Sequence, residues 1–144
     1  MPTAQSWVVW ALASAVFAAL TAIFAKIGLE GVDSDYATLV RTAVIIVVLA
    51  LFVVGTGKWR SPATLSFHSG LFLVLSALAT GASWLCYFRA LKMGEASRVA
   101  PIDKLSVTLV ALFAVIILGE RPTPREWLGI ICVGGGVLLL SLRR

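Results

Sequence analysis

The stretch SRVAPIDKLSVTLVALFAVIILGER, residues 97–121, starts like a capped helix and continues as an apolar run of membrane-spanning length. Asp103 and Lys104 lie inside this run, close behind Pro101. A charge at membrane depth is costly, and it usually faces the interior of a helix bundle or a water-filled cavity. The stretch therefore predicts a membrane helix with a polar, functional start, around which the rest of the chain is organised.

The composition indicates that the other helices also cross a membrane. Of the 144 residues 60% are hydrophobic and only 13% are charged, and the mean hydropathy is +0.99. Apolar runs of about 20 residues alternate with short polar connections, the pattern of a polytopic helical membrane protein. We therefore predict an all-α integral membrane protein with a single domain, residues 1–144. Its five helices are expected over residues 7–29, 36–54, 70–91, 98–118 and 125–142.

The charged and metal-binding residue types narrow the possible partners. The net charge of +5 comes from Lys and Arg residues that flank the apolar runs, where they meet lipid headgroups. Membrane lipids are therefore expected partners, and nucleic acid is not. Cys86 and Cys132 lie within apolar runs, the chain has one His, and no CxxC occurs. We expect no metal site, no cofactor and no catalytic group, since no acid pair or activated nucleophile lies at membrane depth.

Two cations and an aromatic cluster lie within the first three helices. Lys26 lies near the end of the first helix, and Arg41 lies more than one turn inside the second. Each can reach the headgroups by snorkelling or can serve as a charge in a cavity. Trp84 and Tyr87, together with Phe88, follow the i, i+3, i+4 spacing of one helix face. They form either the wall of a substrate pocket or ordinary core packing with an interfacial belt.

The start of the fourth helix has two possible arrangements. Ser97 can cap it, or Pro101 can be its first residue, where the missing N–H costs nothing. In the second arrangement Asp103 occupies the third helical position, where a carboxylate is favoured by the helix dipole. Lys104 has no comparable structural role. Adjacent helical residues point about 100° apart, so one of the two charges is expected to face a cavity while the other caps or pairs.

The charges also favour one side of the membrane. Five charged residues lie in the halves of their helices that are nearest one side of the membrane: Lys26, Arg41, Arg89, Asp103 and Lys104. Together they can ring a vestibule that attracts anionic or zwitterionic solutes. Alternatively, most of these cations reach lipid phosphates.

The last helix has two glycines, Gly129 and Gly136, seven residues apart. They share a face that allows close packing against a second copy.

Several segments in order resemble the EamA domain of the drug/metabolite transporter superfamily. They are residues 87–91, the turn 92–97, residues 99–106, residues 118–121 and the glycine-rich last helix. The resemblance covers essentially the whole chain. Most members of the family carry two such domains as inverted repeats in ten helices, whereas this chain carries one. The resemblance thus implies that the single five-helix unit pairs with a second copy.

The resemblance also implies a function. Many members of the family export small metabolites, so we expect a secondary transporter of a small-molecule solute, working as a homodimer in the cell (inner) membrane. The alternative is a non-transporting membrane subunit or assembly factor that requires a different partner. The identity of the substrate does not transfer with the resemblance. The candidate residues for substrate binding or translocation are Lys26, Arg41, Trp84, Tyr87, Asp103 and Lys104.

Overall fold

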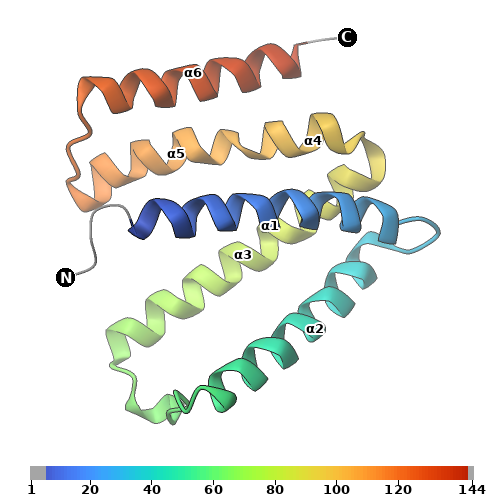
Figure 1. The fold of residues 1–144 in the computed structure, drawn as a ribbon, viewed down its shortest axis with the longest axis vertical. Helices are drawn as coiled ribbons and strands as arrows, with labels where there is room; N and C mark the ends of the chain where they lie inside the picture. Colours follow the sequence, from blue (N-terminus) through green and yellow to red (C-terminus); the bar gives the residue numbers. More distant parts are fainter. Residues whose placement is uncertain (1–5, 143–144) are drawn as a thin grey trace. The chain divides into compact units, whose positions relative to one another are not determined.

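The computed structural model describes residues 6–142, and within this range the regular structure is entirely helical (Figure 1). The α-helices are α1 (Ser6–Gly28), α2 (Ser34–Gly55), α3 (Phe67–Met93), α4 (Ala96–Asp103), α5 (Leu105–Phe113) and α6 (Pro124–Ser141). A 3-10 turn, η1 (Pro62–Thr64), lies in the loop before α3, and a π-helical turn, η2 (Ala114–Leu118), follows α5.

Within residues 6–142, five helical segments are long and apolar enough to cross a membrane. They are Trp7–Gly28, Ser34–Gly55, Phe67–Met93, Ala96–Leu118 and Pro124–Ser141. The fourth of these combines α4, α5 and η2. The predicted all-α membrane fold is confirmed, and the β-branched run 43–54 is part of helix α2.

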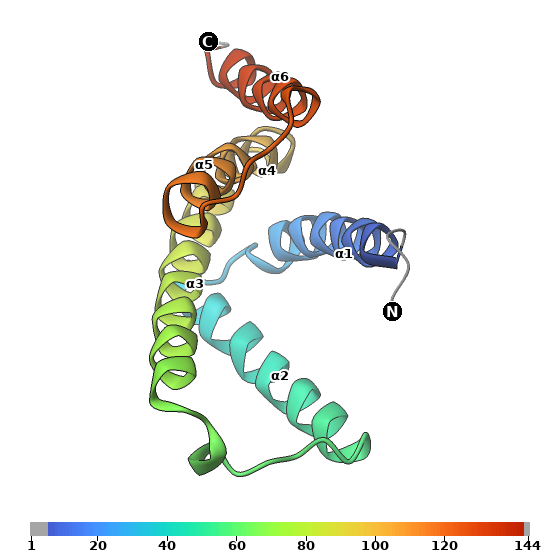
Figure 2. The ribbon, with the colours of Figure 1, turned by 90° about the vertical axis from the view of Figure 1, so that its left-hand side faces the viewer.

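The chain forms two compact units. One unit is Phe24–Met93, which holds the last turn of α1 together with α2 and α3. The other consists of α1 up to Ile23 and of the chain from Gly94 onward, which holds α4, α5 and α6. In the first unit α2 packs against α3, and Figure 2 shows the two helices diverging toward the loop that joins them. In the second unit α6 packs against both α4 and α5.

Local sequence explains where α2 and α6 begin and where the fourth span ends. The Asp33 carboxylate caps α2 by accepting hydrogen bonds from the backbone N–H groups of Asp35 and Tyr36. Thr123 and Glu126 form a capping box at α6, and Pro124 occupies the first turn of that helix. Gly119 ends the fourth span with φ of 69°, a left-handed conformation that suits glycine.

The start of the fourth span differs from both predicted arrangements. Its N-cap is Glu95, so Ser97 does not cap the helix and Pro101 lies inside it rather than at its start. Because Pro101 lacks an N–H, it removes one backbone hydrogen bond from α4. The helix is interrupted three residues later at Lys104, whose N–H donates to the Pro101 carbonyl at 3.0 Å. Asp103 consequently ends a helix, and the capping role considered for it is wrong.

The contact between α5 and α6 depends on a glycine. Gly134 is buried, and a Cβ atom built on it would lie 2.8 Å from Oγ1 of Thr108. Gly129 and Gly136, the two glycines expected at a helix contact, have no such neighbour within 4 Å inside the chain. Close backbone approach between α5 and α6 is therefore provided by Gly134, and among residues 6–142 nothing packs against Gly129 or Gly136 at such a distance.

We expect Gly134→Ala to destabilise the protein and Gly135→Ala to stabilise it slightly. The new methyl group at residue 134 clashes with Thr108, at a cost of about 1–3 kcal/mol. Residue 135 faces open space, so the gain in helix propensity there is about 0.5–1 kcal/mol. Thermal unfolding of the helical circular dichroism signal in maltoside micelles measures both. Equal midpoints for the two variants would contradict this packing.

Candidate functional site

Polar contacts join the start of α2 to the end of α3. The Arg89 guanidinium donates from Nε to Oδ1 of Asp35 at 2.9 Å and from Nη2 to Oδ2 at 2.6 Å. This bidentate geometry is the strongest form of an arginine–carboxylate contact. Beside it, Nζ of Lys92 donates to the Val32 carbonyl at 2.7 Å. These contacts hold α2 and α3 together at one end. The Arg89 guanidinium therefore binds a carboxylate of the protein and does not merely extend toward the lipid headgroups.

Lys26 has a protein partner at the same end of the unit. Its Nζ donates to the backbone carbonyl of Leu91 at 2.6 Å. Leu91 is fully buried in the last turns of α3, where carbonyl groups lack partners within their own helix. A cation at this end of a helix is also favoured by the helix dipole. In this structure Lys26 therefore connects the end of α1 to the end of α3.

Arg41 lies against the aromatic cluster of α3. Its guanidinium carbon is 4.1 Å from the centroid of the Trp84 ring and 5.4 Å from that of Phe88. Both distances are within the range of a cation–π interaction. Phe88 is buried, and its ring centroid lies 6.4 Å from that of Tyr87. The structure thus brings together Arg41, Trp84 and Tyr87, three of the six predicted site residues.

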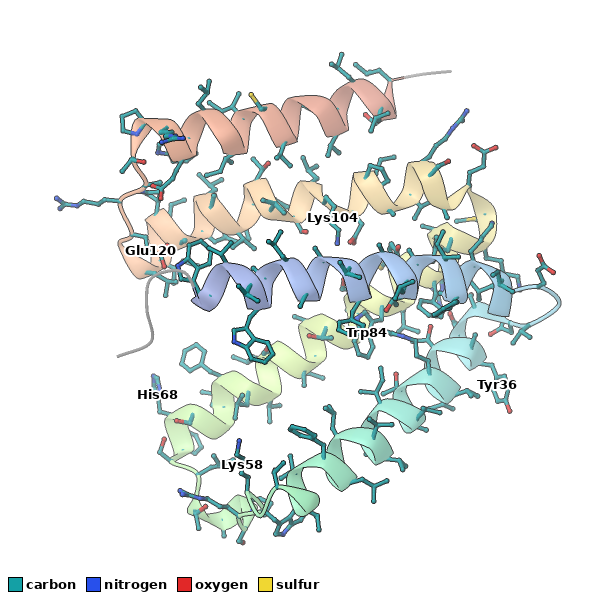
Figure 3. The ribbon with its side chains drawn as sticks, viewed as in Figure 1. Tyr36, Lys58, His68, Trp84, Lys104 and Glu120 are labelled. Carbon is teal, nitrogen blue, oxygen red and sulfur yellow. The ribbon has the colours of Figure 1, made fainter. Side chains whose placement is uncertain are left out.

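A groove of about 570 Å³ lies between α2 and α3, and Trp84 forms part of its lining (Figure 3). Asp35 lies in the lining as well, together with the small and hydroxyl residues Thr38, Thr42, Ser76, Ala77, Thr80 and Gly81 and the apolar residues Leu39, Ile45, Ile46, Leu73 and Leu85. Its volume falls within the ordinary range of small-molecule sites. The groove is therefore a candidate site in the unit Phe24–Met93.

The three threonine hydroxyls of the groove are satisfied inside their own helices. Thr42 donates to the Thr38 carbonyl at 2.7 Å, and Thr38 donates to the Ser34 carbonyl at 2.8 Å. On α3, Thr80 donates to the Ser76 carbonyl at 2.9 Å. Such bonds allow hydroxyl residues to lie at membrane depth without an unpaired donor. Sequence reasoning missed these residues, although their spacing of four on each helix was a usable signal.

Asp103 and Lys104 lie at the break between α4 and α5, where Figure 3 labels Lys104. Nζ of Lys104 is 3.4 Å from Oδ2 of Asp103, and both side chains are partly exposed, at 53% and 37%. The break occurs eight residues into the span Ala96–Leu118, which places an ion pair at an interruption of the backbone helix. The two side chains thus lie next to each other at the break. Their role in transport stays a prediction.

The vestibule that would unite all these charges also stays a prediction. Lys26, Arg41, Trp84 and Tyr87 belong to one compact unit, whereas Asp103 and Lys104 belong to the other. Within residues 6–142, no group of three His, Cys, Asp or Glu residues is arranged to hold a metal ion. The observed groups can bind charged and apolar parts of a solute.

The five apolar spans define a multi-pass membrane protein. Residues 5–142 match the EamA-like transporter family, and the chain belongs to this family, as its motifs predicted.

The relatives carry names of the same kind. An "uncharacterized transporter in cobO 3′ region" from Sinorhizobium sp is 56% identical over 138 residues, which cover 96% of this chain and 98% of that protein. A "probable 4-amino-4-deoxy-L-arabinose-phosphoundecaprenol flippase subunit ArnE" from Yersinia pestis (strain Pestoides F) is 30% identical over 84 residues, which cover 58% of this chain and 74% of that protein. No solved structure matches the chain.

We expect Asp35→Asn and Arg89→Gln each to lower the thermal unfolding midpoint, because each removes one half of the contact between α2 and α3. The double variant should unfold no earlier than the less stable single variant, since both changes break the same interaction. Arg98→Gln is the matched control, because Arg98 pairs only three residues away with Glu95, at 3.2 Å. If the effects of Asp35→Asn and Arg89→Gln simply add, the two side chains are not coupled.

Proposed function

We propose that this transporter exports a small metabolite across the cell (inner) membrane as a homodimer, with the path between the two five-helix copies. The observation that carries the proposal is the ion pair of Asp103 and Lys104 at the interruption of a membrane span. Secondary transporters commonly build their sites from discontinuous helices near the middle of the membrane.

The position of the break supports a path rather than a lipid-facing surface. Lys104 follows the start of its 23-residue span by eight residues, or about 12 Å of helix. A charged pair at this depth is costly in hydrocarbon, whereas it is stable beside water or a polar solute. The interruption also leaves backbone groups without their usual helical partners, and these groups can bind a solute as it passes.

The amount of burial supports a second copy. No span has more than 11% of its apolar window buried inside the chain. Lipid can cover much of the exposed surface, but five helices are too few to enclose a polar path through both leaflets. The face with Gly129 and Gly136 is open, and Gly129 lines a groove of about 800 Å³ along α5 and α6. Helices with small residues on one face associate closely in membranes.

A second candidate function is that of one subunit in an assembly with a different protein. The name of the Yersinia relative favours it, because that protein is described as a flippase subunit. In this case the chain alone would neither dimerise stably nor move a solute. Its cargo could then be an amphipathic lipid-linked molecule rather than a free metabolite.

We expect Lys104→Gln and Asp103→Asn to reduce export at matched membrane abundance. Solutes that accumulate in the medium of cells producing the protein are identified by mass spectrometry, and their efflux is then measured from liposomes holding the purified chain. Loss of one contact between a charged residue and the solute should lower the rate about 10- to 100-fold. Arg98→Gln is the control, since Arg98 is exposed and paired with Glu95. Unchanged efflux in both site variants would remove the pair from the mechanism.

We expect Gly129→Leu and Gly136→Leu to weaken homodimerisation, because a larger side chain prevents close approach on that face. The measurement is the yield of the cross-linked dimer in native membranes. Gly135→Leu is a matched control on a different helix face, since residue 135 also has open space around it. If all three variants give the dimer yield of the wild type, the contact lies elsewhere.

A further inference from the structure

We infer that Arg41 binds an oxyanion, a carboxylate or a phosphate, on an amphipathic ligand whose apolar body lies in the groove between α2 and α3. The inference deepens the proposed transport function, on which its physiological meaning rests. It assigns a chemical class to the ligand. It also gives Arg41 a role that explains its position against the aromatic rings of α3, which snorkelling to the headgroups would not explain.

The first argument is an unsatisfied donor. Nη1 of Arg41 is buried, and it has no hydrogen-bond partner among the residues that the structure describes. A guanidinium group stays charged in proteins, so Arg41 cannot avoid this cost by losing its proton. A buried donor without an acceptor is expensive, particularly where water is scarce. The site is therefore more stable when a ligand supplies the acceptor.

The second argument is that none of the nearby carboxylates is paired with Arg41. The unit Phe24–Met93 contains three acidic residues, Glu30, Asp33 and Asp35. Asp35 is engaged by Arg89 through both oxygens, and Asp33 caps α2. Glu30 is exposed in the link between α1 and α2. Among residues 6–142, Arg41 thus keeps its charge inside the span without an ion pair to a carboxylate.

The third argument is the way in which the guanidinium is held. The guanidinium carbon of Arg41 lies over the rings of Trp84 and Phe88, at 4.1 and 5.4 Å from their centroids, and these ring contacts take up none of its N–H groups. The N–H groups of a guanidinium point outward in its plane, so a stacked arginine can still donate two parallel bonds from its edge. The aromatic rings thus orient Arg41 without using its donors, which is the arrangement that oxyanion recognition requires.

The fourth argument is the surface beside it. Trp84 contacts Arg41 and also lines the groove between α2 and α3. The threonine hydroxyls in the groove donate to carbonyls of their own helices, so they offer few free donors to a ligand. The remaining lining is mainly aliphatic, and its carboxylate, Asp35, is already engaged by Arg89 through both oxygens. A ligand with an apolar body and one anionic end fits these two environments, whereas a sugar or a cation does not.

The test is a series of ligands that differ in charge. Isothermal titration calorimetry in uncharged maltoside micelles, with protein-free micelles as the blank, compares 4-phenylbutyrate with its neutral amide and with 4-phenylbutylamine. Phenyl phosphate tests the second oxyanion. Phosphatidylglycerol added to the micelles distinguishes a lipid headgroup as the source of the oxyanion from a soluble ligand. We expect an anion, soluble or lipid, to bind, and the amide and the amine to bind at least about tenfold more weakly.

Variants of Arg41 test whether this residue binds the anion. Arg41→Gln should weaken binding of the anion about 10- to 100-fold, and Arg41→Lys should weaken it less, because it keeps the charge but loses the planar stack. Arg60→Gln, an exposed arginine in the loop before α3, should bind like the wild type. Circular dichroism and gel filtration confirm folding, and Arg41→Lys serves as the decisive variant if Arg41→Gln unfolds.

Failure of this inference can be told apart from failure of the proposed function. Binding of no anion, or equal binding by the wild type and both Arg41 variants, overturns the oxyanion site even if liposomes show export of another solute. Binding of an anion that depends on Arg41 supports the site even if the chain alone moves no solute, which would instead favour the subunit function.

Discussion

The bidentate contact between Arg89 and Asp35 sets the geometry on which the candidate site depends. It joins the end of α3 to the start of α2, and the bond from Lys92 to the Val32 carbonyl reinforces the same junction. Because the two helices meet there and diverge toward their loop, a groove forms between them. The same junction brings Arg41 of α2 over the aromatic rings of α3.

The membrane explains why these polar groups are so fully paired. In hydrocarbon a polar group must find its partner within the protein, since no water is available. Lys26 finds a helix-terminal carbonyl, and the threonines of the groove find carbonyls one turn earlier in their own helices. Two buried side-chain atoms, Nη1 of Arg41 and Oγ1 of Thr108, have no such partner among the described residues. The Thr108 hydroxyl lies at the close contact of α5 with Gly134, whereas Arg41 lies beside Trp84, which lines the groove.

The two compact units place different chemistry in different parts of the chain. Residues 24–93 combine an arginine, aromatic rings and an apolar groove, which suits recognition of an amphipathic anion. The second unit holds an ion pair at a helix break, together with the close packing of Gly134 against Thr108. The break between α4 and α5 provides a local polar site, and the close packing of α6 on α5 holds α5 in place. Secondary transporters commonly build their binding sites at interrupted helices.

The amino-acid sequence by itself determined the five membrane spans, the left-handed stop at Gly119 and the family, because hydropathy, glycine conformation and ordered motifs are local properties of the chain. It also selected Arg41, Trp84 and Tyr87 as candidates, since unusual charges and aromatic spacing are visible in one dimension. Only the tertiary structure decided that Arg89 contacts Asp35, 54 residues away, and that Lys26 bonds to a carbonyl of α3. Only the tertiary structure decided as well that Gly134, rather than Gly129 or Gly136, packs within the chain. These contacts depend on how helices meet in space. The start of the fourth span at Glu95, with Pro101 inside the helix, likewise does not follow from local capping preferences alone.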